Sequence, residues 1–212
     1  MIELFYSPTP NGRKISIMLE ETKIKYKITS INLGKKEQFK PEFLKINPYG
    51  KIPAIIDHEK DLVLIESGAI LIYLARKSNQ FLPKKNEIRI FEWLMFQISN
   101  VGPILGQLHH FSHFNPGKSL YSEERFYKGA LGVYAALNNQ LKKNNYIAGE
   151  EYSIADIALF PWIARHDWHM PDRIDLRNNY KFLVSWYEKV GSRLAVIRGY
   201  NCLNTEEKIP II

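Results

Sequence analysis

Residues 51–57 carry the groups that would bind the backbone of a small peptide. The apolar segment Ala54–Asp57 is preceded by Pro53, and proline gives a β-ladder no N–H and tolerates a cis bond. The peptide edge at Ile52, immediately before the proline, is therefore predicted to face solvent or a ligand. Its N–H and C=O would then pair with the backbone of an extended peptide.

Glu66 and Ser67 are candidates for binding the charged end of such a peptide. They lie where the apolar run 63–65 ends and a helical pattern begins. A carboxylate, a hydroxyl and the free N–H groups of a helix start converge at such a corner. Glu66 is expected to bind an amino group and Ser67 a carboxylate. Together with Ile52 they predict a site for a small peptide with a free α-amino-carboxylate, which we interpret as glutathione.

Thr9 and Asn11 are the candidate catalytic residues, because they follow the first predicted strand and lead into a helix. A free thiol has a pKa near about 8.5, so chemistry at the glutathione sulfur needs groups that stabilise a thiolate. The Thr9 hydroxyl, the Asn11 amide and the first helix N–H groups can all point at one sulfur, with Asn11 as the expected N-cap. Ser7, and after it Tyr6, are the alternative hydroxyls, although Tyr6 ends an apolar strand and is expected in the core.

The elements that position these residues follow from the hydrophobic pattern. Short apolar or alternating runs predict strands at 2–6, 26–31, 54–57 and 63–65. Helical periodicity predicts a helix that ends near 22–23, with one apolar face, and further helices at 41–46 and 68–76. The order βαβαββα contains a crossover suited to parallel strand pairing.

After this unit the pattern becomes helical almost to the end of the chain. A polar stretch at 78–86, which contains Pro83, places a boundary there, so we expect domains at 1–79 and 88–212 joined by a linker at 80–87. Helices are predicted at 88–111 (kinked or split at Gly102–Pro103), 123–141, 157–163, 180–190 and 193–198. Ser153 and Asp156 fit a capping box that starts a helix apolar nearly all round.

Composition narrows the classes of function. The chain has 212 residues, of which 45% are hydrophobic, and a formal net charge of +7. Its lysines are scattered among carboxylates, which indicates a soluble protein that attracts small anions rather than one that binds nucleic acid. No apolar run is long enough to cross a membrane and no targeting segment is visible. The single cysteine, Cys202, excludes an internal disulfide and favours a reducing, cytoplasmic setting.

Three segments in this order resemble the cytosolic glutathione transferases: Lys51–Ala54, Glu66–Ile70 and Ser153–Ala158. Within that superfamily, Pro8–Gly12 and Gly102–Phe111 resemble the nu class of bacterial enzymes, which reduces disulfides with glutathione. The resemblance covers the whole chain. It implies an α/β plus all-α protein, with a thioredoxin-like βαβαββα N-terminal domain and an all-helical C-terminal domain that forms the pocket for the second substrate.

The resemblance also assigns further residues and partners. Gln38 and Lys51 are expected near the glycyl end or the γ-glutamyl chain of glutathione. Independently of the resemblance, Gln107, His109, His110 and Trp168 are expected to roof the second-substrate pocket, with buried, hydrogen-bonded histidines as the alternative for His109 and His110. His109 and His113 share a helix face, but no nearby carboxylate or cysteine completes a metal site. No cofactor is expected, since glutathione serves as co-substrate. The resemblance also implies a homodimer. Where the nu class carries an arginine that reaches the partner's ligand, this chain has Gly132, with Arg125 or Lys128 as substitutes.

The main hypothesis is therefore a glutathione-dependent reductase of small disulfides or peroxides. Two alternatives stay open at this point: a general transferase that conjugates small electrophiles, and a glutathione-binding regulatory protein without turnover. Nucleic-acid binding through the positive charge is a weaker third possibility.

Overall fold

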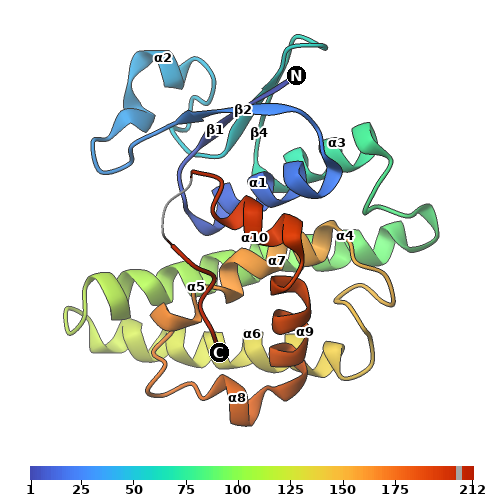
Figure 1. Cartoon of the computed structure of the whole chain (residues 1–212). Coiled ribbons are helices and arrows are strands. Elements are labelled where there is room, and N and C mark those ends of the chain that lie inside the picture. Colours follow the sequence, from blue (N-terminus) through green and yellow to red (C-terminus); the bar gives the residue numbers. More distant parts are fainter. Residues whose placement is uncertain (204–206) are drawn as a thin grey trace.

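In the computed structural model, residues 1–203 and 207–212 are described, and they form a mixed sheet with helices followed by a helical unit (Figure 1). The N-terminal elements are, in chain order, β1 (Ile2–Tyr6), α1 (Pro10–Thr22), β2 (Tyr26–Ser30), η1 (Glu37–Phe39), α2 (Pro41–Leu44), β3 (Ala54–Asp57), β4 (Leu62–Ile65) and α3 (Ser67–Ser78). Apart from η1, which was not predicted, these are the predicted strands and helices, with ends shifted by a few residues. The thioredoxin-like order βαβαββα is confirmed.

The four strands form one sheet in the order β2-β1-β3-β4. β1 and β2 are parallel, because the crossover through α1 returns the chain in the same direction, and β3 and β4 pair as antiparallel strands. In the register, Leu4 lies opposite Ile28 on β2 and Ile55 on β3. The bond between Ile52 and Pro53, which leads into β3, is cis.

Helix α1 is buried on every side, which corrects the prediction of a single apolar face. All residues from Gly12 to Leu19 are buried, Arg13 and Lys14 among them. The cause is that α1 packs against α3 and also against α7 and α10 of the helical unit. The contact with α10 is close, since a Cβ on Gly199 would lie 2.5 Å from the Cα of Ile17, and Ser16 Oγ donates to the Gly199 carbonyl at 2.6 Å.

The helical unit carries the predicted helices and some that the pattern did not predict. Its elements are η2 (Lys84–Asn86), α4 (Glu87–Phe96), η3 (Gln97–Val101), α5 (Gly102–Leu108), η4 (His109–Phe114), α6 (Leu120–Leu141), α7 (Ile154–Ile163), η5 (His166–Trp168), α8 (Leu176–Asn179), α9 (Lys181–Gly191) and α10 (Leu194–Tyr200). Helix α6 begins three residues before its predicted start because Ser119, not a later residue, caps it. The short α8, capped by Asp175, was not predicted.

The expected break near Gly102–Pro103 is a π-helical turn, η3, that joins α4 to α5. Proline has no N–H to donate and its ring crowds the carbonyl four residues earlier, so the helix widens just before it. A second π-helical segment, η4, follows α5. These wide turns line the side of the helical unit that faces the N-termini of α1 and α3.

Helix α7 lies at the centre of the molecule, between the sheet unit and α6 (Figure 1). All ten of its residues are buried, as its all-round apolar sequence predicts. The capping box is present: Ser153 Oγ accepts from the Ala155 N–H, and Asp156 Oδ2 accepts from the Ser153 N–H at 3.0 Å. One continuous core surrounds α7 and includes residues of both units. Among the described residues, no helix is long and apolar enough to cross a membrane.

Candidate functional site

A cavity of about 490 Å³ lies where the first turns of α1 and α3 face η3, α5 and α7. Five predicted site residues line it: Asn11, Glu66, Ser67, Gln107 and His110. The other lining residues were not predicted from the sequence; they are Lys14, Gln97, Ile98, Gly102, Pro103, Gly106 and Trp162. The candidate site therefore draws its walls from both units of the chain.

Thr9, rather than Asn11, is the N-cap of α1, which corrects the predicted cap. Thr9 Oγ1 accepts a hydrogen bond from the Gly12 N–H at 3.1 Å, and Pro10 occupies the first helical position. Because the oxygen accepts, the hydroxyl proton of Thr9 is free to donate elsewhere. The tight turn requires Gly12, where a Cβ would lie 2.2 Å from the Ser7 carbonyl oxygen.

Asn11 lies in the first turn of α1 and is held by a residue of the other unit. Its Oδ1 accepts a hydrogen bond from Nε1 of Trp162 at 3.2 Å. The indole N–H can only donate, so the amide oxygen must face the tryptophan and the amide Nδ2 must face away from it. Nδ2 is then a fixed donor at the N-terminal end of α1, where the helix dipole also favours an anion.

Glu66 and Ser67 form the predicted corner at the start of α3. Glu66 is exposed, makes no side-chain cap and adopts a left-handed backbone with φ of 66°, a region that non-glycine residues avoid. Such conformations cluster at functional sites. Ser67 Oγ accepts from Nζ of the buried Lys14 at 3.1 Å, and Lys14 also donates to Gln97 Oε1 at 2.5 Å. Burial lowers the pKa of Lys14 to about 7, against an opposing effect of the Glu66 charge.

Ile52 and Pro53 lie at the start of β3, with Ile52 half-buried and Pro53 buried. Within the described part of the chain, the Ile52 N–H donates no hydrogen bond, as the docking edge requires. The loop before it is held by Asn47, whose Nδ2 donates to the Lys51 carbonyl at 2.7 Å. Lys51 is exposed, and its Nζ lies 5.5 Å from the centre of the Tyr49 ring.

Gln38 lies in η1, beside this loop: its carbonyl would be 3.1 Å from a Cβ on Gly50. Its Oε1 is buried and has no hydrogen-bond partner among the described residues. Neither Gln38 nor Lys51 lines the cavity, and nor do Ile52, Pro53 or Thr9. Their assignments to glutathione stay predictions.

His109 and Trp168 do not line the cavity either, so their place in the roof of the second-substrate pocket stays a prediction. His109 is buried, stacks on Trp162 and shares a hydrogen bond with His169, with 2.5 Å between the two Nε2 atoms. His169 is in turn hydrogen-bonded to the Tyr134 hydroxyl. Burial lowers the pKa of His109 to about 3 and that of His169 well below its usual range, so both rings are neutral.

Trp168 packs among aromatic rings instead, with the Arg165 guanidinium 3.7 Å from its ring centre and the His113 ring stacked on it. Of the alternative hydroxyls, Tyr6 is in the core as expected, and burial raises the pKa of its phenol. Ser7 is buried and does not line the cavity. Within residues 1–203 and 207–212, no group of three or more His, Cys, Asp or Glu side chains is arranged to hold a metal ion.

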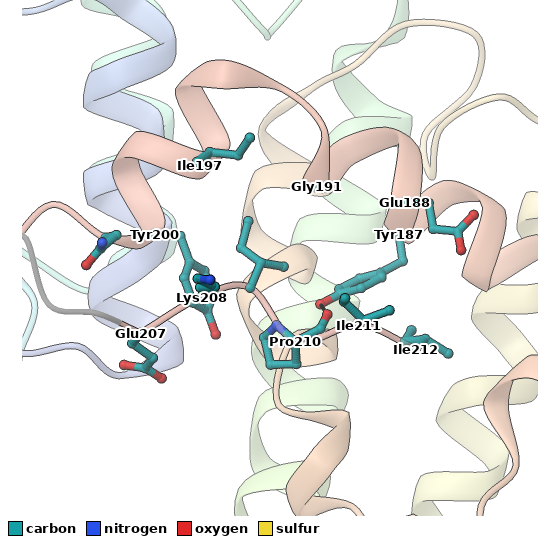
Figure 2. A pocket seen from close by; sticks show the side chains of 12 residues that line it. Tyr187, Glu188, Gly191, Ile197, Tyr200, Glu207, Lys208, Pro210, Ile211 and Ile212 are labelled. Carbon is teal, nitrogen blue, oxygen red and sulfur yellow. Dashed lines mark hydrogen bonds between the residues drawn. The ribbon is translucent and has the colours of Figure 1, made fainter.

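A second cavity, of about 390 Å³, is separate from the predicted site residues. It lies between α9, α10 and the C-terminal segment 207–212, and Figure 2 shows the rings of Tyr187 and Tyr200 beside this segment. Tyr187 donates its hydroxyl to the Pro210 carbonyl at 2.6 Å, and Glu207 binds Arg13 at 2.5 Å and Arg165 at 2.7 Å. These contacts anchor the end of the chain to α1 and to the end of α7.

Comparison with known protein families matches both units of the chain. Residues 2–76 match the glutathione S-transferase N-terminal domain, and residues 103–193 match the glutathione S-transferase C-terminal domain. Among curated proteins, the chain is 44% identical over 202 residues to the disulfide-bond oxidoreductase YfcG of Escherichia coli, covering 92% of each chain. It is 36% identical to the disulfide-bond oxidoreductase YghU of the same organism, over 93% of this chain and 78% of that protein.

Solved structures agree with these matches. A glutathione transferase family member from Pseudomonas fluorescens, with two glutathione molecules bound, superposes with a TM-score of 0.88 at 39% identity, over 94% of this chain and 92% of that one. A glutathione transferase from Pseudomonas putida, with one glutathione disulfide bound per subunit, gives a TM-score of 0.88 at 35% identity, over 94% and 90% of the two chains. The chain belongs to the glutathione S-transferase family.

Proposed function

We propose that this protein is a glutathione-dependent disulfide-bond reductase that acts through a glutathione thiolate stabilised by Thr9 and Asn11. The observation that carries the proposal is the hydrogen bond from Trp162 to Asn11, which leaves the amide N–H₂ of Asn11 as a donor at the start of α1. The names of the E. coli relatives, both disulfide-bond oxidoreductases, support the reaction.

In the proposed complex, glutathione lies along the Ile52 edge with its γ-glutamyl end at the start of α3. The Ile52 backbone pairs with the cysteinyl unit, the Glu66 carboxylate binds the amino group, and Ser67 binds the carboxylate. Gln38 and Lys51 flank the rest of the peptide. The cysteinyl sulfur then reaches the N-terminal end of α1, where the Thr9 hydroxyl and the Asn11 amide donate to it.

The reaction begins when this thiolate attacks one sulfur of the substrate disulfide. A new S–S bond joins glutathione to that half of the substrate, the original S–S bond breaks, and the other half leaves as a thiolate that takes up a proton. A second glutathione then attacks the mixed disulfide, releasing the remaining substrate thiol and glutathione disulfide. The two electrons come from two glutathione molecules, so no resident cofactor is needed. With a hydroperoxide, the same thiolate would attack one oxygen, the O–O bond would break and the other oxygen would leave as an alcohol after taking up a proton. A second glutathione would then attack the resulting sulfenic acid, which gives glutathione disulfide and water.

The second substrate would enter from the α5 side, where Gln107 and His110 line the cavity. We further propose that the protein acts in the cytoplasm as a homodimer. Gly132 stands where the nu class carries an arginine. It is exposed on α6, and a Cβ at this position would meet nothing within 4 Å. Arg125 and Lys128, both exposed on the same helix, are the proposed substitutes.

The test is steady-state reduction of 2-hydroxyethyl disulfide with glutathione, run beside conjugation of a standard aryl halide. We expect strong disulfide turnover and weak conjugation. Replacing Thr9 by Val and Asn11 by Ala should lower turnover while glutathione binding is retained. Strong conjugation with weak reduction would instead indicate a detoxifying transferase, and no turnover in either assay would indicate a binding protein.

A further inference from the structure

Two buried guanidinium groups, those of Arg13 and Arg165, share the carboxylate of Glu207. Arg13 is 1% exposed and belongs to α1, and Arg165 is 7% exposed and lies just beyond the end of α7. Glu207 Oε2 accepts from Arg13 at 2.5 Å, and Glu207 Oε1 accepts from Arg165 at 2.7 Å. Buried charges persist when they are paired. One side chain of the C-terminal segment therefore neutralises two cations that belong to different units of the chain.

Each guanidinium is also fixed on its other sides. Arg13 Nε donates to the Tyr200 carbonyl at 3.2 Å, and its guanidinium lies 3.7 Å from the centre of the Tyr200 ring. Arg165 donates to Asp167 Oδ2 at 2.8 Å. Among the described residues, Glu207 is the only carboxylate within ion-pair distance of Arg13. Loss of the Glu207 carboxylate would therefore leave a buried cation unpaired near the start of α1.

This bridge lies behind the proposed catalytic donors, because neither Arg13 nor Glu207 lines the first cavity. Arg13 is two residues after Asn11, and side chains two positions apart on a helix do not face each other. Arg165 is three residues after Trp162, whose Nε1 donates to Asn11. The start of α1 is thus tied to the end of α7 twice, once at the cavity by the Trp162–Asn11 bond and once behind it by Glu207.

The segment that carries Glu207 is itself attached to the helical unit. Figure 2 shows Glu207 at one end of this segment and Ile212 at the other. The Tyr187 hydroxyl of α9 donates to the Pro210 carbonyl at 2.6 Å, and Arg177 of α8 donates to the Ile212 carbonyl. Helices α8 and α9 therefore keep the Glu207 carboxylate in place between the two guanidiniums.

We propose that Glu207 is a positioning residue for disulfide reduction: it holds the first turn of α1 where the Thr9 and Asn11 donors meet the glutathione sulfur. This inference rests on the proposed function. Glu207 acts through Arg13 on α1 and through Arg165 on the end of α7. Binding of the rest of glutathione should not depend on it, because no hydrogen bond among the described residues joins either arginine to the loop before β3 or to the start of α3.

A role in positioning and a role through charge alone predict opposite signs for a variant that lacks the carboxylate. Without Glu207, the two guanidiniums keep their charge and lose the anion that they share. If Glu207 acted only through its charge, the stronger positive field near α1 would stabilise the thiolate and lower the pKa of the bound thiol further. If Glu207 holds α1 in place, the donors lose their direction toward the sulfur and the pKa rises toward the free value.

The test measures the pKa of the thiol of bound glutathione, from thiolate absorbance in the ultraviolet, in the wild type and in Glu207→Gln. We expect the variant to raise this pKa by about 0.5–1. At pH 6 and saturating glutathione, where the thiolate fraction limits the rate, kcat for reduction of 2-hydroxyethyl disulfide should fall about 3- to 10-fold. The affinity for S-methylglutathione, measured by calorimetry, should change by less than about twofold.

Two controls separate this role from others. Glu188→Gln removes a carboxylate that lines the same second cavity as Glu207 but forms no ion pair among the described residues, and it should leave the pKa and kcat unchanged. In a variant that combines Thr9→Val with Asn11→Ala, Glu207→Gln should not raise the pKa further, because the groups through which it acts are gone.

Circular dichroism melting shows whether each variant is folded. If Glu207→Gln does not fold, the thiol pKa in Glu207→Asp decides by the same sign, because the shorter side chain cannot reach both guanidiniums from the same backbone position.

An unchanged or lowered thiol pKa in the folded variant would overturn the positioning role and leave the proposed function intact. A loss of S-methylglutathione affinity as large as the loss of kcat would also overturn it, because it would indicate a general loosening of the site. A wild-type complex whose thiol titrates like free glutathione would overturn the proposed function itself, and the positioning role with it.

Discussion

Trp162 and Asn11 are 151 positions apart in the sequence, yet the indole Nε1 of the first donates to the amide oxygen of the second at 3.2 Å. The bond joins the centre of the helical unit to the first turn of α1. It determines which end of the Asn11 amide is available to a ligand, because an indole N–H cannot accept. A residue of the helical unit thereby orients a group proposed to act on the glutathione sulfur.

Replacing Trp162 by Phe tests this orientation. The variant keeps most of the ring and loses the N–H, so the Asn11 amide can rotate and its donor is no longer fixed. We expect kcat/KM for disulfide reduction to fall about 5- to 30-fold, as for the loss of one hydrogen bond of about 1–2 kcal/mol. Affinity for S-methylglutathione should hardly change. An unaltered kcat/KM would show that Asn11 needs no support from Trp162.

The neutral pair His109 and His169 predicts a dependence of stability on pH. The folded-state pKa of His109 is lowered to about 3, whereas the unfolded chain binds a proton near about 6.5. Between these two values the unfolded state therefore binds more protons than the folded state. As the pH falls below about 6.5, the free energy of unfolding should decrease by roughly 1 kcal/mol per pH unit for each such histidine. Urea unfolding at several pH values gives the slope of the free energy of unfolding against pH. In His109→Gln this slope should be smaller than in the wild type by the contribution of about one proton. An identical slope would rule out a neutral His109 as its source.

Asp156 is predicted to be a large single contributor to stability. It is fully buried, and its carboxylate accepts from the Ile147 N–H at 2.9 Å, from the Ser153 N–H at 3.0 Å and from Trp186 Nε1 at 2.8 Å. Asp156→Ala leaves these donors unpaired and should lower the free energy of unfolding by at least about 3 kcal/mol. Ser153→Ala, which mainly removes a cap, should lower it by only about 1 kcal/mol. Equal losses in urea denaturation would contradict this hierarchy.

Two helical glycines should respond with opposite signs to the same substitution. A Cβ on Gly132 meets nothing within 4 Å, whereas a Cβ on Gly199 would lie 2.5 Å from the Cα of Ile17. Gly132→Ala should therefore raise the free energy of unfolding by about 0.5–1 kcal/mol, the propensity difference between the two residues. Gly199→Ala should lower it, because α10 must move away from α1. Thermal or urea unfolding of the two variants checks both signs.

The sequence was sufficient to predict the fold because the local signals agree with one another. The strand and helix periodicities, the proline before β3, the Glu66–Ser67 corner and the capping box of α7 are all local features, and each was found where expected. The wide turn before α5 was predicted as a break because Pro103 marks it, although its π-helical form was not.

The candidate site was predicted less completely, because its missing members depend on contacts between the two units. Lys14 looks like part of a polar helix face, whereas in the fold it is buried between α1, Ser67 of α3 and Gln97 of η3. Trp162 looks like one more apolar residue of α7, and the only local hint is that a buried indole N–H needs a partner. The burial of His109 likewise depends on a distant residue, His169, to which it is hydrogen-bonded.

The pKa of the thiol of bound glutathione is the decisive quantity for the proposed thiolate site, and it can be measured from thiolate absorbance in the ultraviolet as the pH is raised. Three proteins are compared: the wild type, Thr9→Val and Asn11→Ala. We predict a pKa one or two units below the free value of about 8.5 in the wild-type complex, and a return toward that value in each variant. A bound thiol that titrates like free glutathione, or a lowered pKa that both variants retain, would contradict a thiolate held by Thr9 and Asn11.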